Sequence, residues 1–305
     1  MFIGHKKNLN FLENALGNGS LANVYCFSGL ANLGKKTLAK KIIAQVLNTE
    51  ESKLFNHPDF LLVSREFDEK TEKTKKDITM EQAEKVRGFL QAKSWHNGYR
   101  TVLLTDAQFL NKTAANAILK TLEEAKDKSL IILVATDTES LPATILSRSQ
   151  LINFTLVSDE EMKSGLLEMN FDSEKIDQAV KLAWGRPGRA IKLLTEANEM
   201  IFWQKEEKRW RELFDQPFYQ KLGEIESLFG DKKEDHIQSR AKLINVLDLW
   251  IMLWREMLLG KNSAIKRYSG KKIIEIIDEI RKAQDLLGKN IHPRLVMENV
   301  ILKFE

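Results

Sequence analysis

A glycine-bracketed loop with two lysines is the stretch of this sequence best suited to chemistry. Gly29 and Gly34 have the spacing of G-x-x-x-x-G-K, and Lys35 and Lys36 follow them. In that pattern, backbone N–H groups at a helix N-terminus bind phosphate oxygens, and the lysine reaches the terminal phosphates. The pattern continues with a Ser or Thr that binds magnesium, but this sequence has Lys36 at that position. The loop therefore predicts a phosphate site with a defect where the metal should bind.

The flanking sequence predicts a parallel α/β domain around this loop. Short, nearly continuous apolar runs alternate with amphipathic helical patterns, as expected for a parallel sheet covered by helices on both faces. A capping box of Thr79 and Gln82 opens one of these helices. Ligands bind at the carboxyl ends of the strands in such sheets. The expected strands cover residues 24–27, 60–63, 99–105, 130–135 and 151–154, and further helices cover residues 79–90 and 111–125.

From Ser158 onward the pattern is wholly helical. Residues 157–200 are predicted to form a small helical lid with Ser158 as an N-cap, and residues 201–305 a helical bundle. An apolar stripe in the bundle is either part of its core or a surface for a partner, and we favour the core. The stripe consists of Leu243, Val246, Leu247, Trp250, Leu253, Trp254 and Met257.

The charge of the chain is nearly balanced. The 305 residues include 47 basic and 43 acidic side chains, which gives a net charge of +4. Attraction to nucleic acid would therefore have to come from local patches. The charge-rich residues 65–77 are predicted to be a solvated loop, with a nucleic-acid contact as the alternative.

Cysteine content and hydropathy narrow the class of protein further. Cys26 is the single cysteine, which excludes an internal disulfide and a cysteine-based zinc site. No apolar stretch has the length of a signal peptide or a membrane span, which needs about 20 residues. We therefore expect a cytoplasmic protein without a membrane partner.

Several short segments match, in order, the signatures of one protein family. Together they resemble the clamp-loader branch of the AAA+ proteins, with Ser149 in place of the cysteine of a Ser-Arg-Cys motif. The resemblance extends to the second-sensor region at 185–190 and to the last helix, which begins near Pro293. The segments are Gly4-His5, Tyr25–Lys41, His57-Pro58-Asp59, Thr105-Asp106-Ala107, Ala114–Glu124 and Ser147-Arg148-Ser149.

The resemblance implies a fold and a domain organisation. It implies an α/β RecA-like parallel sheet of the AAA+ type over residues 1–156, a three-helix lid over 157–200, and an all-α collar for oligomerisation over 201–305. Family members commonly carry a four-cysteine zinc module after the loop helix. Residues 48–56 are short here and contain no cysteine, so no zinc is expected.

The resemblance also assigns the metal-binding positions, and two of the expected ligands are missing. Lys36 occupies the hydroxyl position, where a cation repels magnesium. Thr37, one residue further, is turned about a quarter of a helical revolution away. Aligning Ala107 with the family's alanine puts Thr105 at the position of the metal-binding aspartate and Asp106 at that of the catalytic glutamate.

These departures predict a degenerate nucleotide site. Leu30 and Asn32 replace the usual Pro and Gly of the loop, although Asn tolerates a positive φ better than most residues. We expect no meaningful ATP hydrolysis and weak or absent ATP binding by this chain. Lys35 is then left to satisfy carbonyl groups or to attract a phosphate. The residues of the degenerate phosphate loop are Gly29, Asn32, Gly34, Lys35, Lys36 and Thr37.

Two arginines take positions that have functions in the family. Arg148 matches the arginine that a clamp-loader subunit presents in trans to the ATP site of its neighbour, where a guanidinium neutralises charge on the γ-phosphate. In isolation it would be interpreted as a surface arginine beside a short helix. Arg189 lies at the second-sensor position, where the defective site favours a structural contact between lid and sheet.

The resemblance implies a non-hydrolysing, stator-like subunit of the bacterial DNA polymerase III clamp loader. Its partners would be gamma or tau subunits and a delta subunit in a hetero-oligomeric ring, which loads the sliding clamp on primed DNA. One rival is a gamma-like motor subunit that hydrolyses ATP itself. Another is a free-standing nucleic-acid-binding protein, which would bind DNA in a salt-sensitive way.

Overall fold

The computed structural model describes two compact units of the chain. The first consists of Met1–Phe67 and Lys75–Thr195, and the second of Asp68–Thr74 and Glu196–Glu305. The lid predicted at 157–200 falls mostly within the first unit, so the division into three domains stays a prediction. The described residues are 2–69, 73–96, 98–124, 128–136, 138–214, 216–229, 236–260, 268–288 and 291–304, with the backbone alone at 73 and 236–238.

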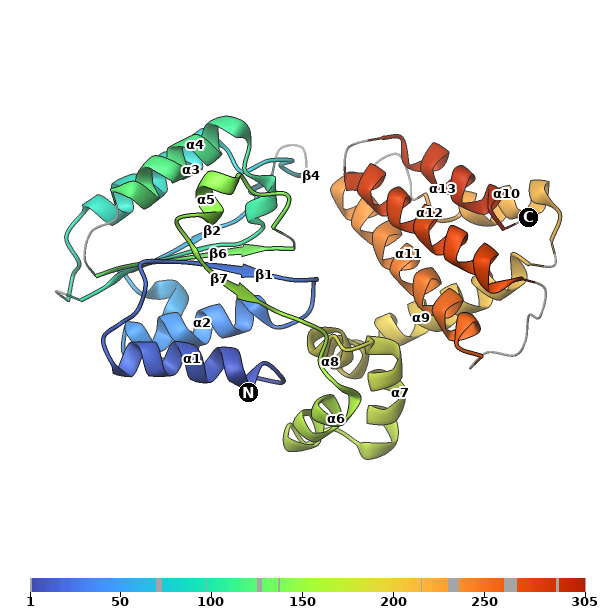
Figure 1. Cartoon of the computed structure of the whole chain (residues 1–305), viewed down its shortest axis with the longest axis horizontal. Helices are drawn as coiled ribbons and strands as arrows, with labels where there is room; N and C mark the ends of the chain where they lie inside the picture. The colour runs from blue at the N-terminus through green and yellow to red at the C-terminus, as the bar shows by residue number, and fades with distance from the viewer. Residues whose placement is uncertain are drawn as a thin grey trace. The chain divides into compact units, whose positions relative to one another are not determined.

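A parallel sheet forms the centre of the first unit. Among the described residues, five strands lie in the order β2-β5-β6-β1-β7, and each neighbouring pair is parallel (Figure 1). Every residue of β1, β5 and β6 is buried, as in strands covered on both faces. The predicted α/β fold is confirmed. The strands are β1 (Val24–Ser28), β2 (Phe60–Val63), β5 (Arg100–Leu104), β6 (Ser129–Ala135) and β7 (Gln150–Asn153).

Helices cover both faces of this sheet (Figure 1). Successive side chains of a strand point to opposite faces, so Tyr25 and Phe27 join one apolar cluster and Val24 and Cys26 the other. The helices α1 (Lys6–Gly17) and α2 (Lys35–Val46) and the short η1 (Glu51–Asn56) cover the first face. The second face is covered by α3 (Met80–Gln91), α4 (Lys112–Glu123) and α5 (Ala143–Leu146).

Side-chain caps fix where these helices begin. The predicted capping box of Thr79 and Gln82 is present at the start of α3, where the Thr79 N–H donates to the Gln82 side chain at 3.1 Å. The Asn111 side chain accepts from the N–H of Ala114 at 2.8 Å at the start of α4. Each cap satisfies an N–H group that the helix itself leaves unpaired.

The lid packs as a small helical layer of the first unit. Its helices are α6 (Asp159–Glu168), α7 (Ser173–Ala183) and α8 (Pro187–Thr195). The Ser158 hydroxyl accepts from the N–H of Glu161 at 3.2 Å, which confirms the predicted N-cap. The apolar faces of these helices enclose a core with Ile3 and Val157.

The prediction of a loop at 65–77 is wrong in part. Residues of this stretch pair as two short strands, β3 (Phe67–Asp68) and β4 (Lys73–Thr74), while residues 70–72 lie outside the described part. The Lys75 ammonium lies 2.7 Å from the Glu66 carboxylate, and the Lys75 N–H donates to the Glu66 carbonyl. Opposite charges therefore pair across the turn, which a count of charges along the sequence does not reveal.

The helices of the second unit enclose an aromatic core. Trp250 and Trp254 are fully buried, and the rings of Trp210 and Phe304 lie 5.5 and 5.2 Å from that of Trp254. All seven residues of the predicted stripe are buried, so the interpretation as core is confirmed and the partner surface is wrong for these residues. The helices are α9 (Ala197–Glu212), α10 (Phe218–Glu226), α11 (His236–Leu258), α12 (Gly270–Gly288) and α13 (Pro293–Leu302).

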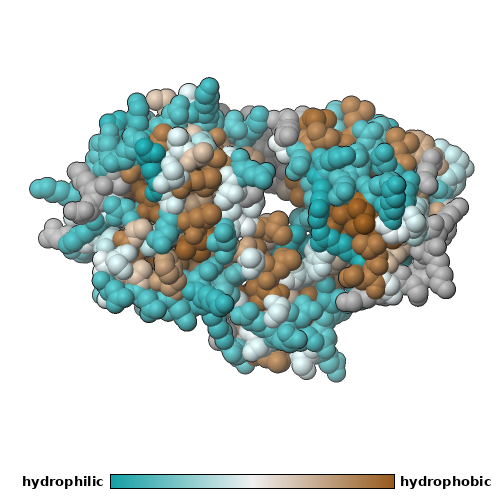
Figure 2. All heavy atoms as spheres, viewed as in Figure 1, coloured by the Kyte–Doolittle hydropathy of each residue, from teal (hydrophilic) through white to brown (hydrophobic). Residues whose placement is uncertain are grey.

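Hydrophilic side chains cover much of the visible surface of each unit, with smaller apolar areas between them (Figure 2). Within the part of the chain that the structure describes, no helix combines the length and the apolar composition that crossing a bilayer requires.

Candidate functional site

The glycine-bracketed loop contains three residues with a positive φ. It connects the end of β1 to the start of α2, and its φ angles are 144° at Gly29, 64° at Asn32 and 89° at Gly34. A side chain at Gly29 would place its Cβ 2.3 Å from the carbonyl oxygen of Phe154, so only glycine fits there. Asn32 adopts the left-handed conformation that the sequence analysis expected it to tolerate.

Lys35 is turned back onto the loop. It is only 6% exposed, and its ammonium donates hydrogen bonds to the carbonyl oxygens of Gly29 and Leu30, the latter at 2.6 Å. Burial lowers the pKa of Lys35 to about 8, and the negative charge of Asp106 opposes the shift. The lysine therefore satisfies the carbonyl groups of its own loop, which is one of the two roles that the sequence left open.

A cavity of about 430 Å³ lies beside the loop. It is lined by residues of the loop, of the carboxyl ends of β5 and β6, and of the lid helix α8. Most of the predicted nucleotide-binding residues line it, whereas Gly29 does not. The lining residues are Ala31, Asn32, Leu33, Gly34, Lys35, Lys36, Thr37, Thr105, Asp106, Gln108, Val134, Ala135, Thr136, Gly188 and Lys192.

Among the described residues that line the cavity, few are placed to supply the oxygen ligands that magnesium prefers. Lys36 and Thr37 are both exposed at its wall. Thr105 is 4% exposed, and its hydroxyl donates to the Val63 carbonyl on the neighbouring strand at 3.5 Å. Asp106 is the one carboxylate among the described lining residues. Because magnesium needs several oxygen ligands and an ammonium group repels it, these residues do not fit a magnesium–nucleotide complex.

The lid contacts the loop directly. The N–H of Gly188, near the start of α8, donates to the Asn32 carbonyl at 2.9 Å. A Cβ at Gly188 would lie 3.0 Å from the same oxygen. Arg189 is 5% exposed and does not line the cavity, and Lys192, three residues further on α8, does. The helix that carries the second-sensor position therefore approaches the site with its glycine and with Lys192.

Sequence reasoning did not assign eight of the described lining residues to the site, and three of those eight, Gln108, Thr136 and Lys192, have polar side chains. Thr136 directly follows β6, and the carboxyl end of a parallel strand is a signal that could have found it. Lys192 lies one helical turn after Gly188, so the helical period could have placed both on one face. Gln108 lies in the 3-10 helix η2 (Ala107–Phe109) after β5, which is too short for a periodic pattern to identify the side that faces the cavity.

Arg148 is exposed immediately after α5. Its side chain is 41% exposed, one Nη lies 2.7 Å from a carboxylate oxygen of Glu123, and the other donates to the Thr144 carbonyl at 3.3 Å. Glu123 is the last residue of α4. The guanidinium is thus accessible from solvent while two of its groups are held by the chain.

The strand register separates Arg148 from the cavity. In the parallel pair of β1 and β7, Tyr25 lies opposite Gln150 and Ser28 opposite Asn153. The loop follows Ser28, whereas Arg148 precedes Gln150. Four strand residues span about 13 Å at roughly 3.3 Å each. Arg148 therefore lies at the amino end of the sheet, opposite to the end that carries the cavity.

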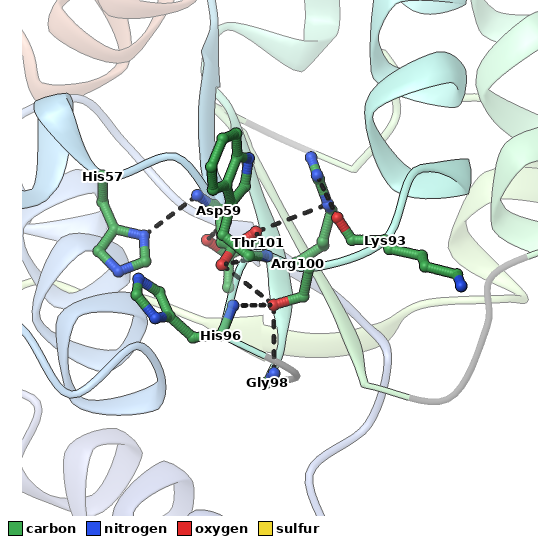
Figure 3. Close-up of polar contacts among 9 residues, drawn as sticks. His57, Asp59, Lys93, His96, Gly98, Arg100 and Thr101 are labelled. Atoms are coloured by element: carbon green, nitrogen blue, oxygen red, sulfur yellow. Dashed lines mark hydrogen bonds and ion pairs between the residues drawn. The ribbon is translucent and has the colours of Figure 1, made fainter.

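A second polar cluster at the amino end of the sheet has a structural role (Figure 3). Asp59 is 1% exposed, and its carboxylate accepts from the Trp95 N–H and the Ser94 hydroxyl, both at 3.0 Å. The Arg100 Nε lies 3.6 Å from it. The His57 ring accepts from the Asp59 N–H at 3.1 Å, as expected for a turn histidine. This segment fixes the loop that leads into β5.

The positions of the side chains that commonly bind metals bear on whether the described part of the chain holds a metal ion. Among the described residues, no three His, Cys, Asp or Glu side chains are grouped closely enough to hold a metal ion. Cys26 is buried within β1, where burial raises the pKa of its thiol to about 11. A thiol with that pKa stays protonated at neutral pH and is a poor metal ligand.

Comparison with known proteins gives consistent matches. Residues 4–158 match the family described as DNA polymerase III, delta subunit. The delta' subunit of Haemophilus influenzae DNA polymerase III is 30% identical over 164 residues, which cover 53% of this chain and 48% of that protein. The delta' subunit of Pseudomonas aeruginosa is 30% identical over 43% of each chain.

A tau subunit is also similar. The Escherichia coli DNA polymerase III subunit tau is 26% identical over 212 residues, which cover 65% of this chain and 30% of that protein. The chain spans about half the length of the curated delta' relatives that it matches. The family match at residues 4–158 covers the part that contains the sheet.

Proposed function

Because this chain belongs to the DNA polymerase III delta subunit family, we propose that it is a non-hydrolysing, stator-like subunit of the bacterial clamp loader. The sequence motifs point to the delta-prime subunit within that family, and curated delta-prime proteins are among its relatives. In this role the chain supplies Arg148 in trans to the ATP site of a neighbouring subunit.

The geometry of its own cavity supports the absence of hydrolysis. Lys35, which would reach the terminal phosphates, is hydrogen-bonded to its own loop. Lys36 lies at the wall where a hydroxyl should bind the metal, and Thr105 is hydrogen-bonded to the neighbouring strand. Phosphoryl transfer depends on magnesium bridging the phosphates. Without ligands for that ion, ATP binding by this chain is weak or absent.

The single observation that carries the proposal is the position of Arg148. It is exposed at the amino end of the sheet, whereas the chain's cavity lies at the carboxyl end. A nucleotide in the chain's own cavity would lie at the other end of the sheet from Arg148, which supports a role for this arginine at the site of another chain. A planar, permanently charged guanidinium is suited to neutralise charge that develops on a transferred phosphoryl group.

The partners follow from this role. Gamma or tau subunits would contribute the working ATP sites, and a delta subunit would complete a hetero-oligomeric ring. The assembled ring would place the sliding clamp on primed DNA. The helical second unit would carry most of the assembly contacts, and the first unit would present Arg148.

The decisive experiment is Arg148→Ala in a loader reconstituted with gamma or tau, delta, clamp and primed DNA. We expect the ATPase kcat of the complex to fall about tenfold or more, since loss of an arginine finger can cost considerably more than this at the affected site. The complex should still co-elute on gel filtration. Arg87→Ala, which removes another exposed arginine of the first unit, is the control. Unchanged kcat in the Arg148→Ala complex would refute the trans role.

Two simple assays test the rival functions. A gamma-like motor would bind a fluorescent ATP analogue with micromolar, magnesium-dependent affinity and turn it over as an isolated chain. A free-standing nucleic-acid-binding protein would bind DNA by itself, with an affinity that falls steeply as salt increases. We expect neither result, because Asp106 is the one carboxylate among the described lining residues of the cavity and the net charge is only +4.

A further inference from the structure

The side chain of Arg148 is held at two points that belong to different elements. The Thr144 carbonyl, in the short helix α5, accepts from one Nη at 3.3 Å. The Glu123 carboxylate, at the end of α4, lies 2.7 Å from the other. A long side chain on a surface normally samples many rotamers, and fixing an arginine costs rotamer entropy. These two contacts restrict it before any partner arrives.

The helix that carries Glu123 is firmly anchored. Ile118 and Leu122 of α4 are at most 7% exposed, and the Asn111 cap fixes the start of the helix. The backbone of Glu123 is therefore set by the core of the first unit. A carboxylate on such a helix is a better reference point for Arg148 than another side chain on a loop would be.

The next carboxylate along the chain has a different partner. Glu124 lies 3.4 Å from the Arg87 Nε and accepts a hydrogen bond from Gln91 at 3.5 Å, and both partners belong to α3. Two successive acids thus divide their roles. Glu124 ties α4 to α3, and Glu123 contacts the arginine that faces solvent. This division supplies a control with the same charge at almost the same place.

We infer that Glu123 is a positioning residue for Arg148 in the reaction of the neighbouring subunit. The inference rests on the proposed trans role of Arg148. Glu123 and the Thr144 carbonyl together hold the guanidinium at the amino end of the sheet, so less conformational freedom is lost when it meets the phosphate. The guanidinium has five N–H donors, and these two contacts leave others to reach a ligand.

The expected size of the effect follows from the exposure of the pair. Both side chains are more than 40% exposed, and exposed ion pairs contribute little because solvent screens them. We expect Glu123→Ala to lower the kcat of the reconstituted loader about two- to fivefold. This lies in the upper part of the range of free energies that exposed ion pairs contribute. The KM for ATP should change little, because the contact acts on the transition state. Glu123→Gln, which keeps an acceptor, should lose less.

A double-mutant cycle separates positioning from general damage. Glu123→Ala, Arg148→Ala and the double variant are assembled with gamma or tau, delta, clamp and primed DNA, and kcat and KM are measured. If Glu123 acts through Arg148, the double variant should match Arg148→Ala alone. Glu124→Ala removes the same charge and should leave kcat unchanged.

Each result decides something. A wild-type kcat for Glu123→Ala, or an equal further loss in the Arg148→Ala background, would overturn the positioning role while the trans role of Arg148 stands. A wild-type kcat for Arg148→Ala would overturn the proposed function and, with it, the role of Glu123. Gel filtration of every complex excludes loss of assembly as the cause.

Discussion

The two ends of the central sheet in the first unit have opposite chemical character. At the carboxyl end, the lysine of the phosphate loop donates to the carbonyl groups of that loop, and a second lysine stands where a metal ligand is needed. At the amino end, Arg148 is held by neighbouring groups and remains accessible. Under the proposed function, one end of the sheet has lost its catalytic role and the other has kept one, while the strands between them carry the packing.

The difference between the two ends lies in how each cation is satisfied. Lys35 is buried, its partners are carbonyl oxygens, and burial disfavours its charged form. The Arg148 guanidinium contacts one carboxylate and one carbonyl oxygen at an exposed position. A buried amine with its donors in use is part of the scaffold, whereas an exposed guanidinium with donors left over can act on a ligand.

The largest effect is expected at the amino end, for Asp59→Ala. This change removes the buried carboxylate that holds the loop of Ser94 and Trp95 and leaves Arg100 without its ion-pair partner. Breaking a buried ion pair typically costs about 3 kcal/mol or more. The free energy of unfolding, measured by urea denaturation, should fall by that amount.

Asp177→Ala is the matched control for Asp59→Ala. Asp177 forms an ion pair with Lys163 at 2.6 Å, but its side chain is 71% exposed. Its loss should cost less than about 1 kcal/mol. An equal loss of unfolding free energy for the two variants would contradict the role of Asp59 in holding the loop that leads into β5.

A smaller but more specific effect is expected at the carboxyl end, for the double variant Lys36→Thr and Thr105→Asp. It restores a hydroxyl and a carboxylate where the metal should bind. We expect magnesium-dependent binding of a fluorescent ATP analogue to strengthen about tenfold relative to the unmodified chain. This corresponds to a gain of roughly 1.4 kcal/mol in binding free energy from the two restored metal ligands. Isothermal titration with and without EDTA gives the measurement.

Lys41→Thr, on the same helix α2 and paired with Glu13, is the control for that gain. It changes the charge of the helix without touching the cavity. If it strengthened binding as much as the double variant, reduced or altered charge on the helix would explain the effect. The contrast between the two ends would then not depend on metal ligands.

The smallest expected effect concerns the contact between lid and loop. Gly188→Ala would place a Cβ 3.0 Å from the Asn32 carbonyl oxygen, and Gly223→Ala, in α10, would meet nothing within 4 Å. Replacing a helical glycine by alanine normally stabilises by about 1 kcal/mol. Gly223→Ala should gain most of this in thermal unfolding, whereas Gly188→Ala should gain none. An equal gain for both would show that the lid does not rest tightly on the loop.

Much of the fold could be predicted from the sequence because its signals are local. The apolar runs at 24–27 and 130–135 have the length and continuity of central strands, and both are buried strands. The caps formed by Thr79 and Ser158 depend on residues three positions apart. The stripe from Leu243 to Met257 follows the helical period, which is why its burial could be foreseen.

The parts that could not be predicted depend on tertiary contacts. The hydrogen bonds of Lys35 to its own loop need the backbone path of that loop, and a motif specifies only residue types. The approach of Lys192 to the cavity depends on how α8 packs, and the pairing of Glu123 with Arg148 joins residues 25 positions apart. The strands within 65–77 pair in a stretch whose charged composition predicts only a solvated loop.

The parallel register of β1 and β7 gives the first unit a direction. If Arg148 acts on a nucleotide bound at the cavity end of a related subunit, the two subunits must meet head to tail, through an interface between two unlike surfaces. In a ring built from such interfaces, each subunit presents its arginine to the neighbour on the same side. Under the proposed function, this chain supplies an arginine to a neighbouring ATP site but does not hydrolyse ATP in its own cavity. The series of working ATP sites around the ring therefore starts next to this chain.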